Sequence, residues 1–508
     1  MTPHDLSTAP LPRGPSGAPG ASGLDAERPR PGLRRPEVVL ALIAVAYAVI
    51  QLVVLPHTMS LEWDEAVYTS QVAPMVPDAD FSAPRARGIT WLVAPVAHFT
   101  VDPTAIRLWL TLVSAAGLFL AFLPWCSLLR GRVLALAAGL FATLWVTIWY
   151  GDQVMPNLYV AYGCLLAAGC SVLTARDRRS GSRSSGSRRS GSWWAWAGLA
   201  AGVAGVALLR PGDALWLALP LGVTALVRRD VRALAVVSAA VAAGFLPWVI
   251  EGFQRFGGPL ERWRAAGEVQ GGIAPAPGFL YEFKTANGPA FCRPCTTTLD
   301  DPQWALWWLV LPLLAICGAV VARSAAHAVA AVTGLCVAVP YLFLVDYSAP
   351  RFLLPAYALL AIPAAEALVR VAGRRPVPLA SALVRITVAI VLAAHVAVQA
   401  YALRDVSAGE TKERGYQAGI VKDMVKLGVH APCTLVGRQV NPAMALIARC
   451  DALSLGAGRP VPDLSHAPEG HVFAVLTKDV PPPGAEKWKR HVLRRSGSRP
   501  TWVAYIRP

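Results

Sequence analysis

The sequence predicts a mainly α-helical protein, a polytopic membrane bundle that ends in a small α/β domain. Of its 508 residues, 55% are hydrophobic and only 15% are charged, whereas a soluble protein carries about 25% charged residues. Long apolar runs recur as far as residue 402, after which the chain becomes polar. These observations exclude a chain that is disordered throughout, and they exclude a single soluble globule.

Apolar runs of helical length set the expected number of membrane spans. A bilayer core about 30 Å thick needs roughly 20 apolar residues in an α-helix. We therefore predict a transmembrane domain over residues 38–402 with about eleven spans. They lie near residues 38–55, 105–129, 133–150, 156–175, 193–209, 213–227, 232–250, 304–322, 327–345, 352–370 and 380–402.

The charges of the connecting loops predict the orientation. Short loops rich in Arg and Lys stay in the cytoplasm, and such loops follow every second span. The N-terminus is therefore expected in the cytoplasm of a plasma-membrane protein. The loops 56–103 and 251–303 and the segment 403–508 are expected outside. The net charge of +16 then follows from topology and gives no reason to predict a nucleic-acid partner.

Two segments have compositions that cannot bury a core. Residues 1–37 are rich in Pro, Gly, Ala and Ser and end in a basic cluster, which predicts a disordered cytoplasmic tail. Residues 176–192 are a Ser/Arg/Gly repeat. A nucleic-acid-binding arm is one interpretation of such a repeat, but a flexible inner loop that helps to set the topology is favoured.

The segment 403–508 predicts a small extracytoplasmic α/β domain. Residues 415–427 have the pattern of an amphipathic helix and 442–448 of a short helix. Short β-branched or aromatic runs predict strands at 433–437, 472–476 and 502–506.

Four of the nine cysteines fall in segments assigned to the outside, where disulfides persist. We predict the pairs Cys292–Cys295 and Cys433–Cys450. A zinc site built from all four is an alternative, whereas a thioredoxin-like role for the first pair is disfavoured because it lies in a Pro/Gly-rich loop. The other five lie in apolar runs as small hydrophobic residues: Cys126, Cys164, Cys170, Cys317 and Cys336.

The most informative stretch follows the first span directly. It contains Glu62, Trp63, Asp64, Glu65 and Tyr68. Helical spacing puts Asp64 and Tyr68 on one face and Trp63 on the other, so we expect a helix at the membrane interface with its carboxylates toward a cavity. An exposed acidic loop anchored by its aromatic residues is the alternative.

This stretch resembles the Asp-Glu signature in the first outer loop of the GT-C class of integral-membrane glycosyltransferases. It looks closest to the bacterial group related to protein O-mannosyltransferases and the lipid A aminoarabinose transferase. Three further motifs resemble that group in the same order: Gly151-Asp152 to Tyr159, Leu209-Arg210-Pro211, and Tyr347 to Tyr357, which contains Arg351. The resemblance covers residues 38–402 and leaves out the C-terminal domain.

The resemblance implies transfer of a sugar from a polyprenyl-phosphate carrier to an acceptor hydroxyl outside the cytoplasm. Asp64 is then the expected general base, and Glu65 is expected to orient the acceptor, the donor sugar or a metal ion. With one carboxylate base and direct attack, the anomeric centre should invert. We expect the substrate-binding side chains to be Tyr68, Asp152, Arg210, Arg351 and Lys284.

Several questions stay open at this level. No cofactor is certain, although Glu65 and Asp152 could hold a divalent cation. The acceptor could be a glycan, a lipid or a protein, and membrane lipids surround the bundle. A transporter or flippase of a lipid-linked cell-envelope precursor would use similar charges. A non-enzymatic scaffold that binds wall polymer through residues 403–508 is a further alternative.

Overall fold

The computed structural model describes residues 35–181, 193–272, 274–296, 298, 302–373, 378–437, 440–454, 471–477, 485, 487–493 and 502–507. Most of the predicted N-terminal tail and residues 182–192 of the predicted inner loop lie outside these ranges. At the described ends of these two predicted segments, a helix begins earlier or ends later than expected. Helix α1 (Pro36–Val54) starts inside the predicted tail, and α7 (Pro156–Gly181) runs six residues into the predicted loop.

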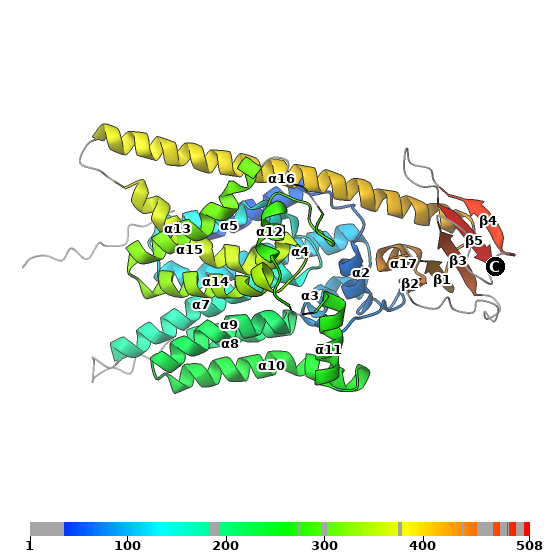
Figure 1. The fold of residues 1–508 in the computed structure, drawn as a ribbon, viewed down its shortest axis with the longest axis horizontal. Helices are drawn as coiled ribbons and strands as arrows, with labels where there is room; N and C mark the ends of the chain where they lie inside the picture. Colours follow the sequence, from blue (N-terminus) through cyan, green and yellow to red (C-terminus); the bar gives the residue numbers. More distant parts are fainter. Residues whose placement is uncertain are drawn as a thin grey trace, which may run out of the picture.

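A bundle of apolar helices forms most of the molecule (Figure 1). Within the described part of the chain, eight helices are long and apolar enough to cross a membrane. Together with α1 and α7 they include α4 (Pro103–Phe122), α10 (Val231–Arg255), α13 (Leu306–Ala322), α14 (Ala325–Phe343), α15 (Leu354–Val371) and α16 (Pro378–Lys426). These eight coincide with eight predicted spans, so the multi-pass architecture is confirmed.

The other three predicted spans correspond to short helices. Helices α8 (Trp193–Leu209) and α9 (Pro211–Val227) have 17 residues each, so α8 has the predicted bounds and α9 starts two residues earlier than predicted. The predicted span 133–150 is divided into α5 (Gly131–Ala142) and α6 (Trp145–Trp149). At this break the backbone N–H of Trp145 donates to Oε1 of Gln399 in α16, 3.0 Å away. A buried side-chain acceptor thus compensates for the lost helical hydrogen bond, which the apolar pattern alone cannot reveal.

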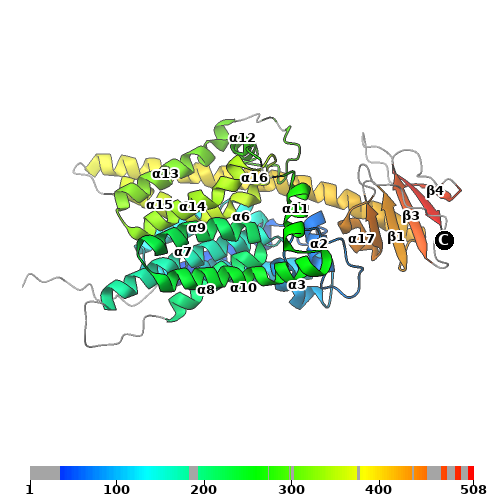
Figure 2. The ribbon, with the colours of Figure 1, turned by 60° about the horizontal axis from the view of Figure 1, so that its bottom comes forward.

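Short helices gather at the end of the bundle where the outer loops were predicted. They are α2 (Trp63–Ser70), α3 (Gly88–Ala97), α11 (Pro259–Gln270) and α12 (Gly278–Lys284). Figure 2 shows α2, α3 and α11 at the end nearest the sheet and α12 farther from it. Arg262 anchors α11 because its guanidinium, which is fully buried, donates to the carbonyl oxygens of Ala83, Arg85 and Trp248. It also pairs with Glu251 at 2.9 Å.

The long helix α16 joins the bundle to the C-terminal domain without a break. It has 49 residues and runs along the side of the bundle to the sheet (Figure 1). The chain therefore has no loop at the predicted domain boundary at residue 403, and the predicted helix 415–427 is the end of α16. A helix satisfies its own backbone hydrogen bonds in lipid and in water, so a change from apolar to polar composition need not end it.

The C-terminal domain is an α/β unit, as predicted. Its five strands are β1 (Cys433–Gly437), β2 (Asp451–Ser454), β3 (Val472–Thr477), β4 (Lys489–Val492) and β5 (Val503–Arg507), in the order β2-β1-β3-β5-β4. Strand β1 is parallel to β2 and β3, and β5 is antiparallel to β3 and β4. Helix α17 (Pro442–Ala448) forms where expected and lies between the sheet and α2 in Figure 1.

Candidate active site

The Asp-Glu pair lies in the first turn of α2, where a capping box sets its orientation. The Glu65 carboxylate accepts the backbone N–H of Glu62 at 2.9 Å, and Glu62 caps the Glu65 backbone in return. Neighbouring residues of a helix point about 100° apart, so the two acids face different surroundings. The side chain of Asp64 is 27% exposed, whereas Glu65 is completely buried.

Asp64 is held between two arginines from distant parts of the chain. Nη2 of Arg85 lies 2.7 Å from its Oδ1, and Nη2 of Arg351 lies 3.1 Å from its Oδ2. Arg351 belongs to the short 3-10 helix η3 (Pro350–Leu353) and also donates to the hydroxyl of Tyr150 at 3.3 Å. Burial would raise the pKa of Asp64, but Arg85 and Arg351 outweigh it and the pKa lies below its usual value. Asp64 is thus a carboxylate at neutral pH.

Arg210 provides a third cation beside this pair. Its charge contributes to the lowered pKa of Asp64, and its own Nε pairs with Asp213 at 2.9 Å. It donates to the hydroxyl of Tyr341 at 2.9 Å, and that hydroxyl donates to Asp213. Tyr68 lies on the same side of α2 as Asp64, since the guanidinium of Arg85 covers its ring at 5.2 Å. We call Asp64, Arg85, Arg210 and Arg351 the Asp64 cluster.

Glu65 belongs to a second, fully buried network. Its Oε2 lies 3.4 Å from Arg107 of α4 and 3.0 Å from Arg414 of α16, and its Oε1 accepts the backbone N–H of Val154 at 2.9 Å. Arg107 also contacts Asp152 at 3.4 Å. Burial would raise the pKa of Glu65, but the two arginines and the backbone N–H groups lower it. We call Glu65, Arg107, Asp152 and Arg414 the Glu65 network.

The two remaining acids of the region have raised pKa values. Burial raises the pKa of Asp152 to about 6, against the attraction of Arg107. Burial likewise raises the pKa of Glu62 to about 7, although Arg351 opposes the shift. Glu62, the N-cap of α2 two residues before Asp64, can therefore exchange a proton near neutral pH. The sequence showed this residue only as part of an acidic run.

The suggested cation site at Glu65 and Asp152 does not fit the observed donor set. The guanidinium of Arg107 contacts both carboxylates, and a divalent cation would have to share that space with a positive charge. Within the described ranges no three His, Cys, Asp or Glu side chains come together in a way that could hold a metal ion.

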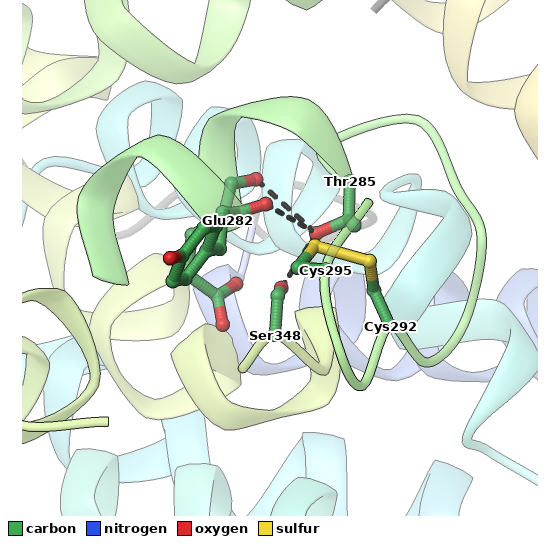
Figure 3. Close-up of a disulfide and its surroundings, with 6 residues drawn as sticks. Glu282, Thr285, Cys292, Cys295 and Ser348 are labelled. Atoms are coloured by element: carbon green, nitrogen blue, oxygen red, sulfur yellow. Dashed lines mark hydrogen bonds between the residues drawn. A yellow bond between two sulfur atoms is a disulfide. The ribbon is translucent and has the colours of Figure 1, made fainter. Parts of the chain in front are cut away.

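Lys284 and the first cysteine pair lie in the predicted outer loop 251–303. Lys284 ends α12, and it makes no ion pair with the described residues of the Asp64 cluster. Cys292 and Cys295 form a disulfide, as do Cys433 and Cys450. Cys292 exchanges two backbone hydrogen bonds with Ser348 (2.9 and 3.2 Å), three residues before Arg351. Figure 3 shows the first disulfide beside Ser348, Thr285 and Glu282.

The structure therefore divides the predicted site residues into two groups. It brings Asp64, Tyr68, Arg210 and Arg351 together and places Glu65 and Asp152 in the buried network behind them. Arg85 and Arg107 are Arg residues of predicted outer loops or span ends, but no motif selected them from the others. Arg414 lies beyond the region of family resemblance, and a single Arg in a polar helix carries no sequence signal of its partner.

We compared this protein with known protein families, curated sequences and solved structures. No protein-family model matches the sequence, and no curated protein matches it significantly. Solved structures do match, and their fold is the GT-C fold of polytopic membrane glycosyltransferases.

ArnT from Cupriavidus metallidurans, an aminoarabinose transferase, shares this fold over almost the whole chain. The structure bound to undecaprenyl phosphate has a TM-score of 0.65 at 14% identity and covers 91% of this chain and 97% of ArnT. The apo state gives a TM-score of 0.63 over the same shares. AglB from Archaeoglobus fulgidus, an oligosaccharyltransferase in complex with an inhibitory peptide and a dolichol-phosphate, gives 0.50 at 12% identity, covering 81% of this chain and 64% of AglB.

Proposed function

We propose that this protein is a membrane glycosyltransferase that moves a sugar from a polyprenyl-phosphate carrier to an acceptor hydroxyl on the outer face of the plasma membrane. The observation that carries the proposal is the Asp64 cluster: one partly exposed carboxylate paired with Arg85 and Arg351, with Arg210 near enough to help lower its pKa. The fold shared with ArnT, which was solved with undecaprenyl phosphate, supports a lipid-phosphate substrate. The loop charges support a cytoplasmic N-terminus and an outer C-terminal domain.

The cluster supplies the two functions that such a transfer needs. The acceptor oxygen attacks the anomeric carbon, the bond from that carbon to the phosphate oxygen breaks, and Asp64 takes the hydroxyl proton. The electron pair of the broken bond leaves on the polyprenyl phosphate. Arg85, Arg210 and Arg351 stabilise its growing negative charge, because fixed cations in a site of low polarity lower the barrier without reorganising. One displacement inverts the anomeric centre.

The ion pairs of Asp64 give this mechanism an order of events. With no phosphate bound, Arg85 and Arg351 hold the carboxylate and keep its pKa low, which weakens it as a base. A bound donor phosphate competes for the same guanidinium groups. Asp64 then becomes the stronger base while the donor is in place. Glu65 and Asp152 have no exposed surface for a substrate, so we assign them to holding the site in shape.

The test uses purified protein in liposomes with a polyprenyl-phosphate-linked radiolabelled sugar and a mixture of envelope acceptors. The wild type should transfer label, and Asp64→Asn should lower the rate about 10²–10⁴-fold while it still binds polyprenyl phosphate. Asp102→Asn is the matched control, because Asp102 caps α4 from an exposed position. Movement of the labelled lipid across the bilayer without transfer would instead identify a flippase and overturn the proposal.

A further inference from the structure

The C-terminal part of the chain reaches the candidate active site through the long helix α16. At 1.5 Å per residue its 49 residues span about 74 Å, whereas a bilayer core takes only about 30 Å. The outer half of α16 therefore extends beyond the membrane and passes beside the loop before α2. There Ser60 donates to the backbone oxygen of Arg414 at 3.3 Å, and Thr411 contacts the sulfur of Met59 at 3.6 Å.

Arg414 is the polar contact between this helix and the acidic pair. Its side chain is only 6% exposed, and its Nη1 lies 3.0 Å from Oε2 of Glu65 and 3.4 Å from Oε1 of Gln153. Its Nε pairs with Glu410, one turn earlier on α16, at 3.0 Å. The same guanidinium lies over the ring of Trp149 at 5.6 Å. One side chain of α16 thus contacts both the first and the second outer loop.

An apolar contact accompanies this polar one. Ala443 and Leu446 of α17 belong to the same buried cluster as Ala66 and Val67 of α2, and α17 packs against both α2 and α16. Asn441, which caps α17, donates to Oε1 of Gln417 in α16 at 3.0 Å. Helices α16 and α17 therefore form one unit that contacts α2 twice, through the apolar side chains of α17 and through Arg414 of α16.

We propose that Arg414 is a positioning residue of the active site, and that the α16–α17 unit must be docked on α2 for sugar transfer to occur. Arg414 orients Glu65, Glu65 caps α2, and α2 holds Asp64 against Arg85 and Arg351. The proposal rests on the proposed glycosyltransferase function for its kinetic part. Its structural part, the dependence of α2 on Arg414, stands independently of the reaction.

The test compares Arg414→Gln and Arg414→Lys with Arg404→Gln in the full-length protein. Arg404 is an exposed residue of the same helix, and its replacement removes the same charge. Hydrogen–deuterium exchange of the peptide 61–71 reports on α2 without any substrate. Transfer from a polyprenyl-phosphate-linked sugar gives kcat, the donor KM and the dependence of kcat on pH, each corrected for the folded fraction.

Arg414→Gln should speed exchange in 61–71 and lower kcat by about 100-fold, with the donor KM within about threefold of wild type because the Asp64 cluster keeps its arginines. The acid limb of the kcat profile of Arg414→Gln should move to higher pH. In this variant Glu65 would face Arg107 from α4, Asp152 from the second outer loop and Glu62 from its own segment. The loss of one cation raises the pKa of Glu65. Arg414→Lys should recover part of kcat, and Arg404→Gln should match the wild type.

Three results would overturn the proposal: unchanged exchange and kcat in Arg414→Gln, equal losses in Arg404→Gln, or a loss of kcat explained by the unfolded fraction with an unchanged pH profile. If the wild type transfers no sugar, the proposed function is refuted. If Arg414→Gln still exchanges faster than the wild type at 61–71, the docking of α16 on α2 is retained. The two failures are thus distinguishable.

Discussion

Nη2 of Arg351 lies 3.1 Å from Oδ2 of Asp64, although 287 positions separate the two residues in the chain. Asp64 follows the first span and Arg351 precedes α15, so the contact exists only because α1 and α15 belong to one bundle. Arg85 completes the arrangement from the other side of the carboxylate. The ion pair thus joins the base of the proposed reaction, Asp64, to Arg351, one of the cations proposed to stabilise the leaving phosphate.

Replacing Arg351 should change how transfer depends on pH. Arg351 helps to lower the pKa of Asp64, so Arg351→Gln should raise that pKa and move the acid limb of kcat/KM to higher pH. The rate at neutral pH should fall about 10²–10³-fold, because one stabilising group of the leaving phosphate is lost. Arg351→Lys keeps the charge and should leave the acid limb near its wild-type position. If the acid limb of kcat/KM were unchanged in Arg351→Gln, titration of Asp64 would not be its cause.

Arg262 should contribute strongly to the stability of the predicted outer loops. Arg262→Gln removes the donors to the carbonyl oxygens of Ala83 and Trp248, whereas Glu251 keeps its ion pairs with Arg87 and Arg255. A buried acceptor left without a donor costs about 1–3 kcal/mol, and the thermal unfolding midpoint should fall accordingly. Arg264→Gln, two residues further along α11 and exposed, should change stability by less than about 0.5 kcal/mol. Similar midpoints for both variants would contradict the anchoring role.

Glu282 should make the stability of the predicted outer loop 251–303 depend on pH. Burial raises its pKa from 4.5 to about 8, against weaker opposing effects of Ser348, Ala349 and Arg351. Below pH 4.5 the carboxyl is protonated whether the chain is folded or unfolded. Between pH 4.5 and 8 only the unfolded state ionises, so stability should fall as pH rises, by at most about 1.4 kcal/mol per pH unit.

Glu282→Gln removes this titration and should flatten the dependence. The unfolding midpoint, measured at pH 5, 6, 7 and 8, should fall less steeply with rising pH in the variant than in the wild type. Glu268→Gln, at an exposed position of α11, should keep the wild-type slope. Parallel curves for the wild type and Glu282→Gln would show that the carboxyl is already ionised in the folded protein.

The two disulfides should differ in their contribution to stability. They close segments of 3 residues (Cys292–Cys295) and 17 residues (Cys433–Cys450), and a longer closed segment removes more entropy from the unfolded chain. Double Ser replacements should cost about 2 kcal/mol for the first pair and about 3 kcal/mol for the second. Calorimetric unfolding of the two variants measures this order, and a reversed order would refute it.

Local patterns predicted much of the architecture. Apolar runs located the helices, and α17 and β1 have the predicted bounds because their hydrophobic periodicity and flanking Pro or Gly residues are local signals. The division between α5 and α6 and the continuity of α16 were not predictable in this way. The first depends on an acceptor from Gln399, and the second on the ability of a helix to leave the bilayer unbroken.

The sequence by itself predicted the fold class, the order of the spans and the disulfide pairs, and it singled out Asp64 as the candidate base, because each prediction depends on composition or on residues close together in the chain. Only the tertiary structure decided the separate surroundings of Asp64 and Glu65. A helix turns neighbouring side chains about 100° apart, and which arginine each carboxylate meets depends on how distant segments pack. Arg85 and Arg351 therefore contact the partly exposed acid, and Arg107 and Arg414 the buried one.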